Sequence, residues 1–248
     1  MEIKLSDRFS YGKLFRFAMP SVIMMLFSSI YGVVDGLFVS NFVGKTEFAA
    51  INLLMPVLMI AGALGFMIGA GGTAVVSKTL GEGEATLAKR YFSLFVYITA
   101  IGGATISAIG IILIRPLSIM LGAEGAMLDA SRRYGRIVLA ALPFFQPQNL
   151  FQSFMIVAER PKLGLAVTVC AGVANMVLDA TLILVIPLGL EGAALATSIS
   201  QLVGGIIPVI YFAKKNSSQL AFTKTKFYGR ALLRAIANGS SELMSAAP

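Results

Sequence analysis

The sequence predicts an all-α polytopic membrane protein, a bundle of six transmembrane helices followed by the start of a seventh. Of its 248 residues 57% are hydrophobic and only 13% are charged, whereas a soluble domain has about 25% charged residues. Apolar stretches of about 20 residues or more recur along the chain, and each is long enough for a helix to cross the hydrocarbon core of a bilayer.

Short polar connectors separate these apolar stretches. Residues 45–47, 81–84, 122–132, 159–162 and 187–191 carry charges, glycine or proline and end one span before the next begins. The N-terminal segment is polar and basic, and the apolar run after it is too long for a cleaved signal peptide. We therefore expect spans near 15–43, 50–77, 91–114, 133–158, 163–187 and 191–213.

The distribution of basic residues predicts the orientation of the bundle. With the N-terminus inside, fifteen of the 20 Lys and Arg residues fall on the inner side. Basic residues concentrate on the cytoplasmic side of membrane proteins. We expect a multi-pass protein of the bacterial cytoplasmic membrane whose N-terminus and 214–234 loop are cytoplasmic.

Composition also argues against several functions. The formal charge of +8 is spread over loops between apolar spans, which is typical of topology signals and not of nucleic-acid binding. One cysteine, Cys170, and no histidine leave no disulfide framework and no ligand set for zinc, copper or a His-based triad. We expect a protein that is not an enzyme and that holds no bound cofactor.

The chain repeats its own beginning after the sixth span. Residues 232–238 can be aligned with residues 14–20, and they follow a long basic loop. This position favours a second six-helix repeat and indicates half of a two-lobe transporter. We expect an N-terminal lobe at 1–213, an inter-lobe loop at 214–234 and the start of a second lobe at 235–248. The second lobe is expected either from a longer chain, of which this is a truncated part, or from an associated half-length chain. Truncation is the favoured alternative.

Two carboxylates lie deep inside apolar spans. Asp35 and Asp179 each lie eight residues before the outer end of their span, so at about 1.5 Å per residue they reach a similar depth. Insertion of such a residue costs about 2.5–3.5 kcal/mol. An acid of this kind can simply bond a neighbouring helix, but two at one depth favour a shared site for a cation or a proton.

Other polar side chains are predicted at the same level. Asn175 lies four residues before Asp179, on the same helix face, and Thr197 and Gln201 are also four apart. Tyr134 begins the fourth span at a comparable height. Carboxylate, amide and hydroxyl oxygens suit a hard cation such as Na⁺, and the same acids could exchange protons instead. Thr197 and Tyr134 are, on this evidence alone, more typical of helix packing.

Prolines and small residues suggest bends and close contacts. Pro20 and Pro147 each remove a helix hydrogen bond and are expected to kink their spans. The pairs Gly65–Gly69 and Gly103–Ser107 predict close helix packing. Near Pro147, the side chains of Gln146, Gln148 and Asn149 are expected to line the lobe interior or to satisfy a kinked backbone.

These motifs, taken in order, resemble the MATE family of multidrug and toxic-compound extrusion transporters. The similarity lies in residues 159–162, 175–179 and 189–197 with Gln201, and in residues 35–39 and 71–74 with Gly44, Leu80 and Gly81. The resemblance covers nearly the whole chain and is closest to bacterial members.

The resemblance implies two six-helix lobes that export small organic cations in exchange for Na⁺ or H⁺. It implies ion-binding or proton-binding roles for Asp35, Asn175, Asp179, Thr197 and Tyr134, and a coupling role for a bend at Pro20. Two alternatives are a lipid-linked oligosaccharide flippase of the same superfamily, and a non-transporting membrane fragment. A flippase cavity is expected to be basic, whereas this chain places acids inside its spans.

Overall fold

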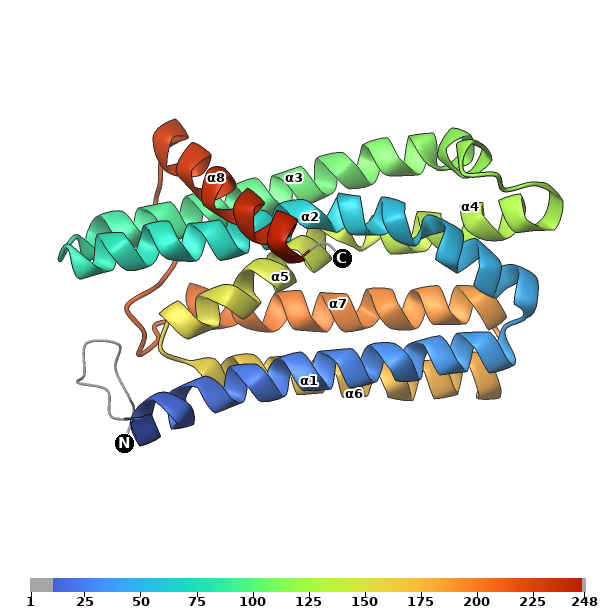
Figure 1. Ribbon diagram of the computed structural model, residues 1–248, viewed down its shortest axis with the longest axis horizontal. Coiled ribbons are helices and arrows are strands. Elements are labelled where there is room, and N and C mark those ends of the chain that lie inside the picture. Colours follow the sequence, from blue (N-terminus) through green and yellow to red (C-terminus); the bar gives the residue numbers. More distant parts are fainter. Residues whose placement is uncertain (1–10, 247–248) are drawn as a thin grey trace.

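The computed structural model describes residues 11–246, and within that range every regular element is helical (Figure 1). Lys4, Arg8 and residues 247–248, which the sequence analysis used for topology and the second repeat, lie outside the described range. The elements are α1 (Tyr11–Phe42), α2 (Lys45–Gly81), α3 (Ala85–Met120), α4 (Gly125–Ala140), α5 (Leu142–Val157), α6 (Pro161–Asp179), η1 (Ala180–Val185), α7 (Gly189–Ala213) and α8 (Gly229–Ala246).

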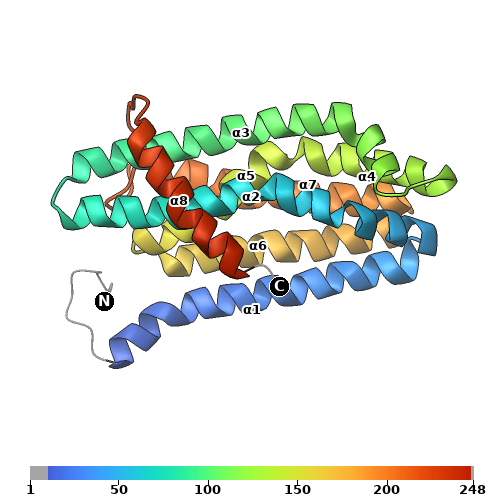
Figure 2. The same ribbon diagram turned by 45° about the horizontal axis from the view of Figure 1, so that its top comes forward.

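The protein is a multi-pass membrane protein. Five helical segments of the described chain are long and apolar enough to cross a bilayer: Ala18–Phe42, Lys45–Gly81, Ala85–Met120, Pro161–Val185 and Gly189–Ala213. They coincide with five of the six expected spans. The bundle is elongated, and its long helices run roughly along one axis (Figure 2).

The remaining expected span, 133–158, is divided into two helices. Helix α4 ends at Ala140, α5 begins at Leu142, and each has only 16 residues. Pro143 has no backbone N–H, so it cannot continue the hydrogen-bond ladder of α4. The carbonyl of Ala141 instead accepts bonds from the N–H groups of Phe144 and Phe145 at 2.9 and 3.0 Å. The break therefore lies six residues before Pro147, the proline at which the sequence analysis placed the bend.

The fifth span changes its helical form at one of the two acids. Helix α6 ends at Asp179 and continues as the six-residue π-helix η1. The N–H of Ile186 donates to the carbonyl of Thr181 at 2.9 Å, the wider spacing of a π turn. Short π segments inside α-helices are frequent at functional sites. The apolar pattern at 163–187 predicts one continuous α-helix, so the π-helical segment is a difference from the prediction.

Glycines bring the backbones of α2, α3 and α5 together, which confirms the close packing that the sequence predicts. A Cβ added at Gly65 would lie 2.6 Å from the carbonyl oxygen of Gln146, and one at Gly103 would lie 2.9 Å from that of Leu142. At Gly69 the nearest atom would be the Cα of Leu150, at 3.1 Å. Only glycine fits at such contacts, so α5 is fixed in the centre of the lobe.

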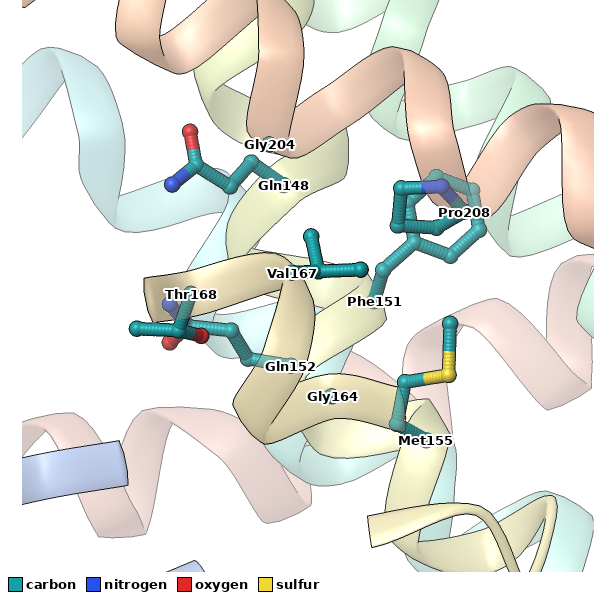
Figure 3. Close-up of a pocket in the computed structure, with 9 residues that line it drawn as sticks. All are labelled: Gln148, Phe151, Gln152, Met155, Gly164, Val167, Thr168, Gly204 and Pro208. Carbon is teal, nitrogen blue, oxygen red and sulfur yellow. The ribbon is translucent and has the colours of Figure 1, made fainter. Parts of the chain in front are cut away.

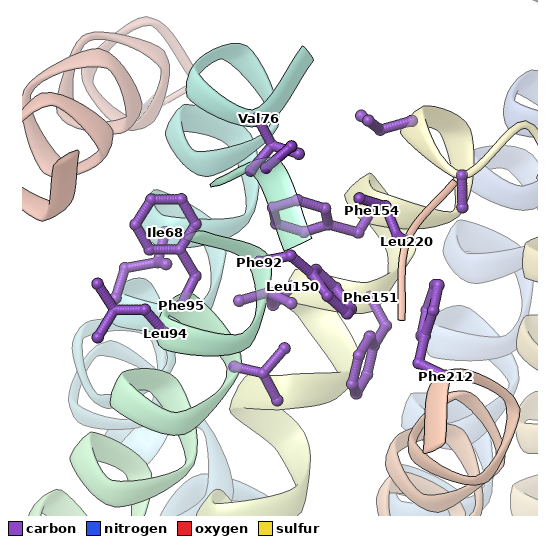
Figure 4. Close-up of a cluster of buried hydrophobic side chains, with 14 of the residues drawn as sticks. Ile68, Val76, Phe92, Leu94, Phe95, Leu150, Phe151, Phe154, Phe212 and Leu220 are labelled. Atoms are coloured by element: carbon purple, nitrogen blue, oxygen red, sulfur yellow. The ribbon is translucent and has the colours of Figure 1, made fainter. Parts of the chain in front are cut away.

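An aromatic cluster contains Phe92, Phe151, Phe154 and Phe212 (Figure 4). Phe222 packs on this cluster and anchors the segment between α7 and α8. Phe92 is fully buried at the centre of the cluster, and its ring centroid lies 4.8 Å from that of Phe212 and 5.6 Å from that of Phe222. The backbone of the segment is also held, because the N–H of Thr223 donates to Ser93 Oγ at 3.0 Å. Residues 220–225 are therefore held against the bundle.

Helix α8 begins at Gly229 and crosses α2 obliquely in both views (Figures 1 and 2). The crossing is very close, because a Cβ at Gly71 would overlap the carbonyl oxygen of Ala235 and one at Gly239 would overlap that of Met67. The helix starts before residue 235, where the sequence analysis placed the boundary of a second lobe.

Truncation of Phe92 to alanine is expected to destabilise the protein by about 3–5 kcal/mol, because the cluster loses its central ring and keeps a cavity. The melting temperature of the purified protein in detergent measures this loss. Phe66→Ala, at a ring that is 48% exposed on α2, is the control and should change the free energy of unfolding by only about 0.5 kcal/mol. Equal losses in the two variants would contradict the anchoring role of the cluster.

Candidate functional site

A polar cavity of about 50 Å³ lies between α1, α5, α6 and α7. A water molecule needs roughly 10–15 Å³ measured in this way, so the cavity has room for several waters or for one partly hydrated cation. Its lining combines carboxylate, amide and hydroxyl groups with a few apolar walls: Tyr31, Asp35, Phe145, Gln148, Thr168, Ala171, Asn175, Thr197, Ser200 and Gln201.

Helix α1 supplies Asp35 and Tyr31, one turn apart on the face that packs against α6 (Figure 1). Gly172 of α6 makes this approach possible. A Cβ at Gly172 would lie 2.5 Å from the ring of Phe27 and 3.2 Å from that of Tyr31. The glycine therefore allows α1 to bring its acid to the cavity between α6 and α7.

Helix α6 supplies Asn175 and Asp179, one turn apart and only 1% and 0% exposed. Asn175 lines the cavity, whereas Asp179 lies behind the lining residues. The carboxyl groups of Asp179 and Asp35 are nevertheless close enough to interact with each other across the contact between α6 and α1. The two acids that the sequence predicts at one depth are thus neighbours.

Several buried oxygens of this region have no hydrogen-bond partner among the residues that the structure describes. They are six atoms from five side chains: Asp35 Oδ1, Gln148 Oε1, Asn175 Oδ1, Asp179 Oδ1, Asp179 Oδ2 and Gln201 Oε1. Buried polar atoms are nearly always paired, and each exception needs an explanation. A cluster of acceptors can be satisfied together by protons, by a cation or by water.

The charges of the two carboxylates also favour a site for a cation or a proton. Two adjacent carboxylates repel each other strongly in a low-dielectric interior, and burial of an unpaired charge is costly. Oxygen-rich sites with unneutralised acids near the middle of a membrane are typical of Na⁺-coupled and H⁺-coupled transporters. The arrangement is therefore suited to reversible binding of a monovalent cation or a proton.

The other residues singled out from the sequence divide between this cavity and the packed core. Thr197 and Gln201 of α7 line the cavity. Tyr134 of α4 does not line it. The ring of Tyr134 is buried in an apolar cluster with residues such as Leu54 and Ile183. Tyr134 is nevertheless near enough to Asp35 and Asp179 to interact electrostatically with them.

The amides near Pro147 also separate. Gln146 donates from Nε2 to the carbonyl of Ala61 at 2.8 Å and so joins α5 to α2. Gln148 lines the cavity. Pro20 is buried in α1, which is continuous as a helix from Tyr11 to Phe42, and a bend there remains a prediction.

Three polar lining residues, Tyr31, Thr168 and Ser200, are not predicted from the sequence, and the first two had a usable signal. That signal is positional, because Tyr31 precedes Asp35 by one turn and Thr168 precedes Asn175 by two turns. A tyrosine or threonine in a span is common in helix packing, so this spacing alone does not identify a ligand.

Comparison with known proteins places this cavity in a recognised transporter fold. A family model described as MatE matches residues 20–181. Two similar curated proteins are both called Multidrug export protein MepA. The one from Staphylococcus saprophyticus is 29% identical over 81% of this chain and 44% of its own length, and the one from Staphylococcus aureus is 28% identical over 83% and 46%. The chain therefore spans about half the length of these relatives.

Solved structures show the same fold. An outward-facing multidrug resistance MATE family transporter of the MOP superfamily superposes with a TM-score of 0.86 at 24% identity, over 93% of this chain and 51% of that one. A MATE transporter in the bent conformation gives a TM-score of 0.82 at 24% identity, over 92% and 52%. The bundle is thus one half of that architecture.

Replacement of Asp179 by asparagine is expected to raise the melting temperature in sodium-free buffer at alkaline pH, where the carboxyl group is charged. The change keeps the side-chain volume and removes a buried charge, for which we expect a gain of about 1–3 kcal/mol. Differential scanning fluorimetry in detergent measures it. Asp129→Asn, at a side chain that is 70% exposed and 3.6 Å from Arg132, is the control and should lose at most about 1 kcal/mol. A lower melting temperature for Asp179→Asn would show that the carboxylate stabilises the fold.

Proposed function

The chain belongs to the MatE family, and on that premise we propose that it forms one lobe of a secondary multidrug efflux antiporter. The antiporter exports small organic cations in exchange for Na⁺ or H⁺ across the bacterial cytoplasmic membrane. The observation that supports this proposal is that Asp35 and Asp179 are neighbours among buried oxygens that have no hydrogen-bond partner in the described part of the chain.

The coupling ion binds at this cluster. In the outward-facing state Na⁺ or H⁺ enters from outside and is held by Asp35 and Asp179, with Asn175 and Thr197 beside them. Neutralisation of the carboxyl pair removes the repulsion between α1 and α6 and favours the conformation that releases the drug outward. Loss of the ion to the inside restores the charge and readmits a cationic substrate. This cycle is alternating access driven by an ion gradient.

Cargo binding requires a second lobe, either from the same polypeptide or from an associated half. Helix α8 supports this proposal, because its close crossing over α2 provides a direct connection between such a lobe and this one. The expected topology, with the N-terminus and the 214–234 loop in the cytoplasm, puts the connection on the inner side.

The polarity of the cavity favours organic cations over a pyrophosphate-linked lipid. A flippase for such a lipid needs basic side chains at its anionic group. Neither Lys nor Arg is among the side chains that line the two cavities characterised in this lobe, whereas Asp35 is. For the same reason we place transport of lipid-linked oligosaccharides second.

Replacement of Asp179 by asparagine should abolish ion-driven efflux while expression stays at the wild-type level. Asparagine cannot cycle between charged and neutral forms, so the ion no longer changes the preferred conformation. Efflux of a fluorescent organic cation from cells, after imposition of a Na⁺ gradient or a pH gradient in turn, measures the effect and distinguishes the two ions. Asp129→Asn serves as the matched control and should transport normally. Undiminished efflux by Asp179→Asn would remove the proposed role of the acid pair.

A further inference from the structure

A second, smaller cavity lies next to the acid-lined one, nearer the end of the lobe where α5 turns into α6 (Figure 3). Gln148 and Thr168 line both cavities and form the wall between them. The rest of its lining is Phe151, Gln152, Met155, Gly164, Val167, Gly204 and Pro208. Its volume of about 10 Å³ is at the lower limit for a single water molecule.

One face of α6 connects the two cavities. Gly164, Thr168, Asn175 and Asp179 follow one another at spacings of four, seven and four residues, which keep them on one side of the helix. From Asp179 to Gly164 the face extends for about 22 Å. The stripe thus begins at the buried acids and ends in the first turn of α6.

Gln148 occupies the junction between the cavities. Its side chain is only 9% exposed, and its Oε1 has no hydrogen-bond partner. Space for the amide comes from Gly204 of α7, where an added Cβ would lie 2.6 Å from Gln148 Cδ. Gln152, one turn further along α5, presents a second amide to the smaller cavity beside Thr168 (Figure 3).

The smaller cavity, the lower one in the expected topology, ends in apolar side chains. Phe151 and Met155 are each 1% exposed and Val167 is 8% exposed, and all three line its wall. They lie near the inner ends of α5 and α6 in the expected topology. These side chains close the route in this conformation, because a hydrated cation cannot pass a gap of this size.

A purely structural amide looks different in the same helix. Gln146 lies two residues before Gln148 and lines neither cavity, and its Nε2 donates to the Ala61 carbonyl at 2.8 Å, although its Oε1 also has no hydrogen-bond partner among the described residues. Gln148 differs in its position, because its side chain lines both cavities. The difference is what separates a group that holds helices together from one that can ligate a passing ion or water.

We propose that Gln148, Gln152 and Thr168 form a transit site through which the coupling cation, as hydrated Na⁺ or a water-borne proton, leaves the acid pair toward the α5–α6 end. The ion then moves through the interior of this lobe and does not require the space between two lobes. Phe151, Val167 and Met155 form the apolar plug that gates the transit site. The proposal rests on the proposed function, because the acid pair is its source of ions.

The test measures access of a hydrophilic reagent to Thr168. In the intact transporter Cys170 is replaced by serine and Thr168 by cysteine. Inside-out membrane vesicles that contain this variant are treated from outside with a small cationic methanethiosulfonate. A thiol scavenger sealed in the lumen removes reagent that crosses the membrane. We expect slow labelling of Thr168→Cys and a severalfold faster rate when Met155→Ala opens the plug. Gln148→Leu should slow ion-driven transport while leaving labelling of Thr168→Cys from this side intact.

The native cysteine provides the matched control. Cys170 is exposed on the outer surface of α6, at nearly the same depth as Thr168 and about 200° away around the helix. The protein that retains Cys170 and Thr168 should stay unlabelled in vesicles, because lipid covers that face. Labelling of Cys170 at the rate of Thr168→Cys would overturn the proposal, since it would mean that the reagent enters through the bilayer.

Failure of the transit site and failure of the proposed function give different results. If Thr168→Cys stays unreactive from the inner side even with Met155→Ala, while Asp179→Asn still abolishes efflux, the transit site is wrong and the antiporter role stands. If Thr168→Cys reacts but Asp179→Asn transports normally, the acid pair has no coupling role and both proposals fall.

Discussion

The lobe depends on satisfying a cluster of buried oxygens that have no hydrogen-bond partner within the described part of the chain. Asp35 and Asp179 approach each other between α1 and α6, with the amide oxygen of Asn175 beside them. In hydrocarbon such a group is stable only when a proton, cation or water neutralises or bonds it. The fold brings the two acids together, because Gly172 lets α1 approach α6. The π-helix begins directly after Asp179.

The acids at the centre of the site could be found from sequence because their signal is energetic. A carboxylate in an apolar span is too costly to occur often without a role, so Asp35 and Asp179 could be selected and assigned a common depth. Thr168 and Tyr31 could not be selected in this way. Their hydroxyl groups cost little in a membrane helix, and only the positions of neighbouring helices show that they face a cavity.

The positions of the membrane spans could be predicted from the sequence, but the breaks within two of the spans could not. Hydropathy identifies where a helix crosses the membrane, but the break at Ala141 and the π turn after Asp179 are changes in hydrogen-bond register. Two prolines close together in sequence, Pro143 and Pro147, allow more than one position for a break. The choice between them depends on the contact of Leu142 with Gly103 of α3, which no local pattern contains.

The anchored segment between α7 and α8 has a mechanical consequence. Phe222 stacks on Phe92, and the N–H of Thr223 donates to Ser93. The segment before α8 is therefore fixed to the bundle a few residues before the helix begins at Gly229. We expect a movement of α8 to be transmitted to the aromatic cluster, which includes Phe151, a residue that also lines the smaller cavity. The contacts of Phe92 with Phe222 and Phe151 would then couple the position of a domain attached to α8 to the width of the proposed transit site.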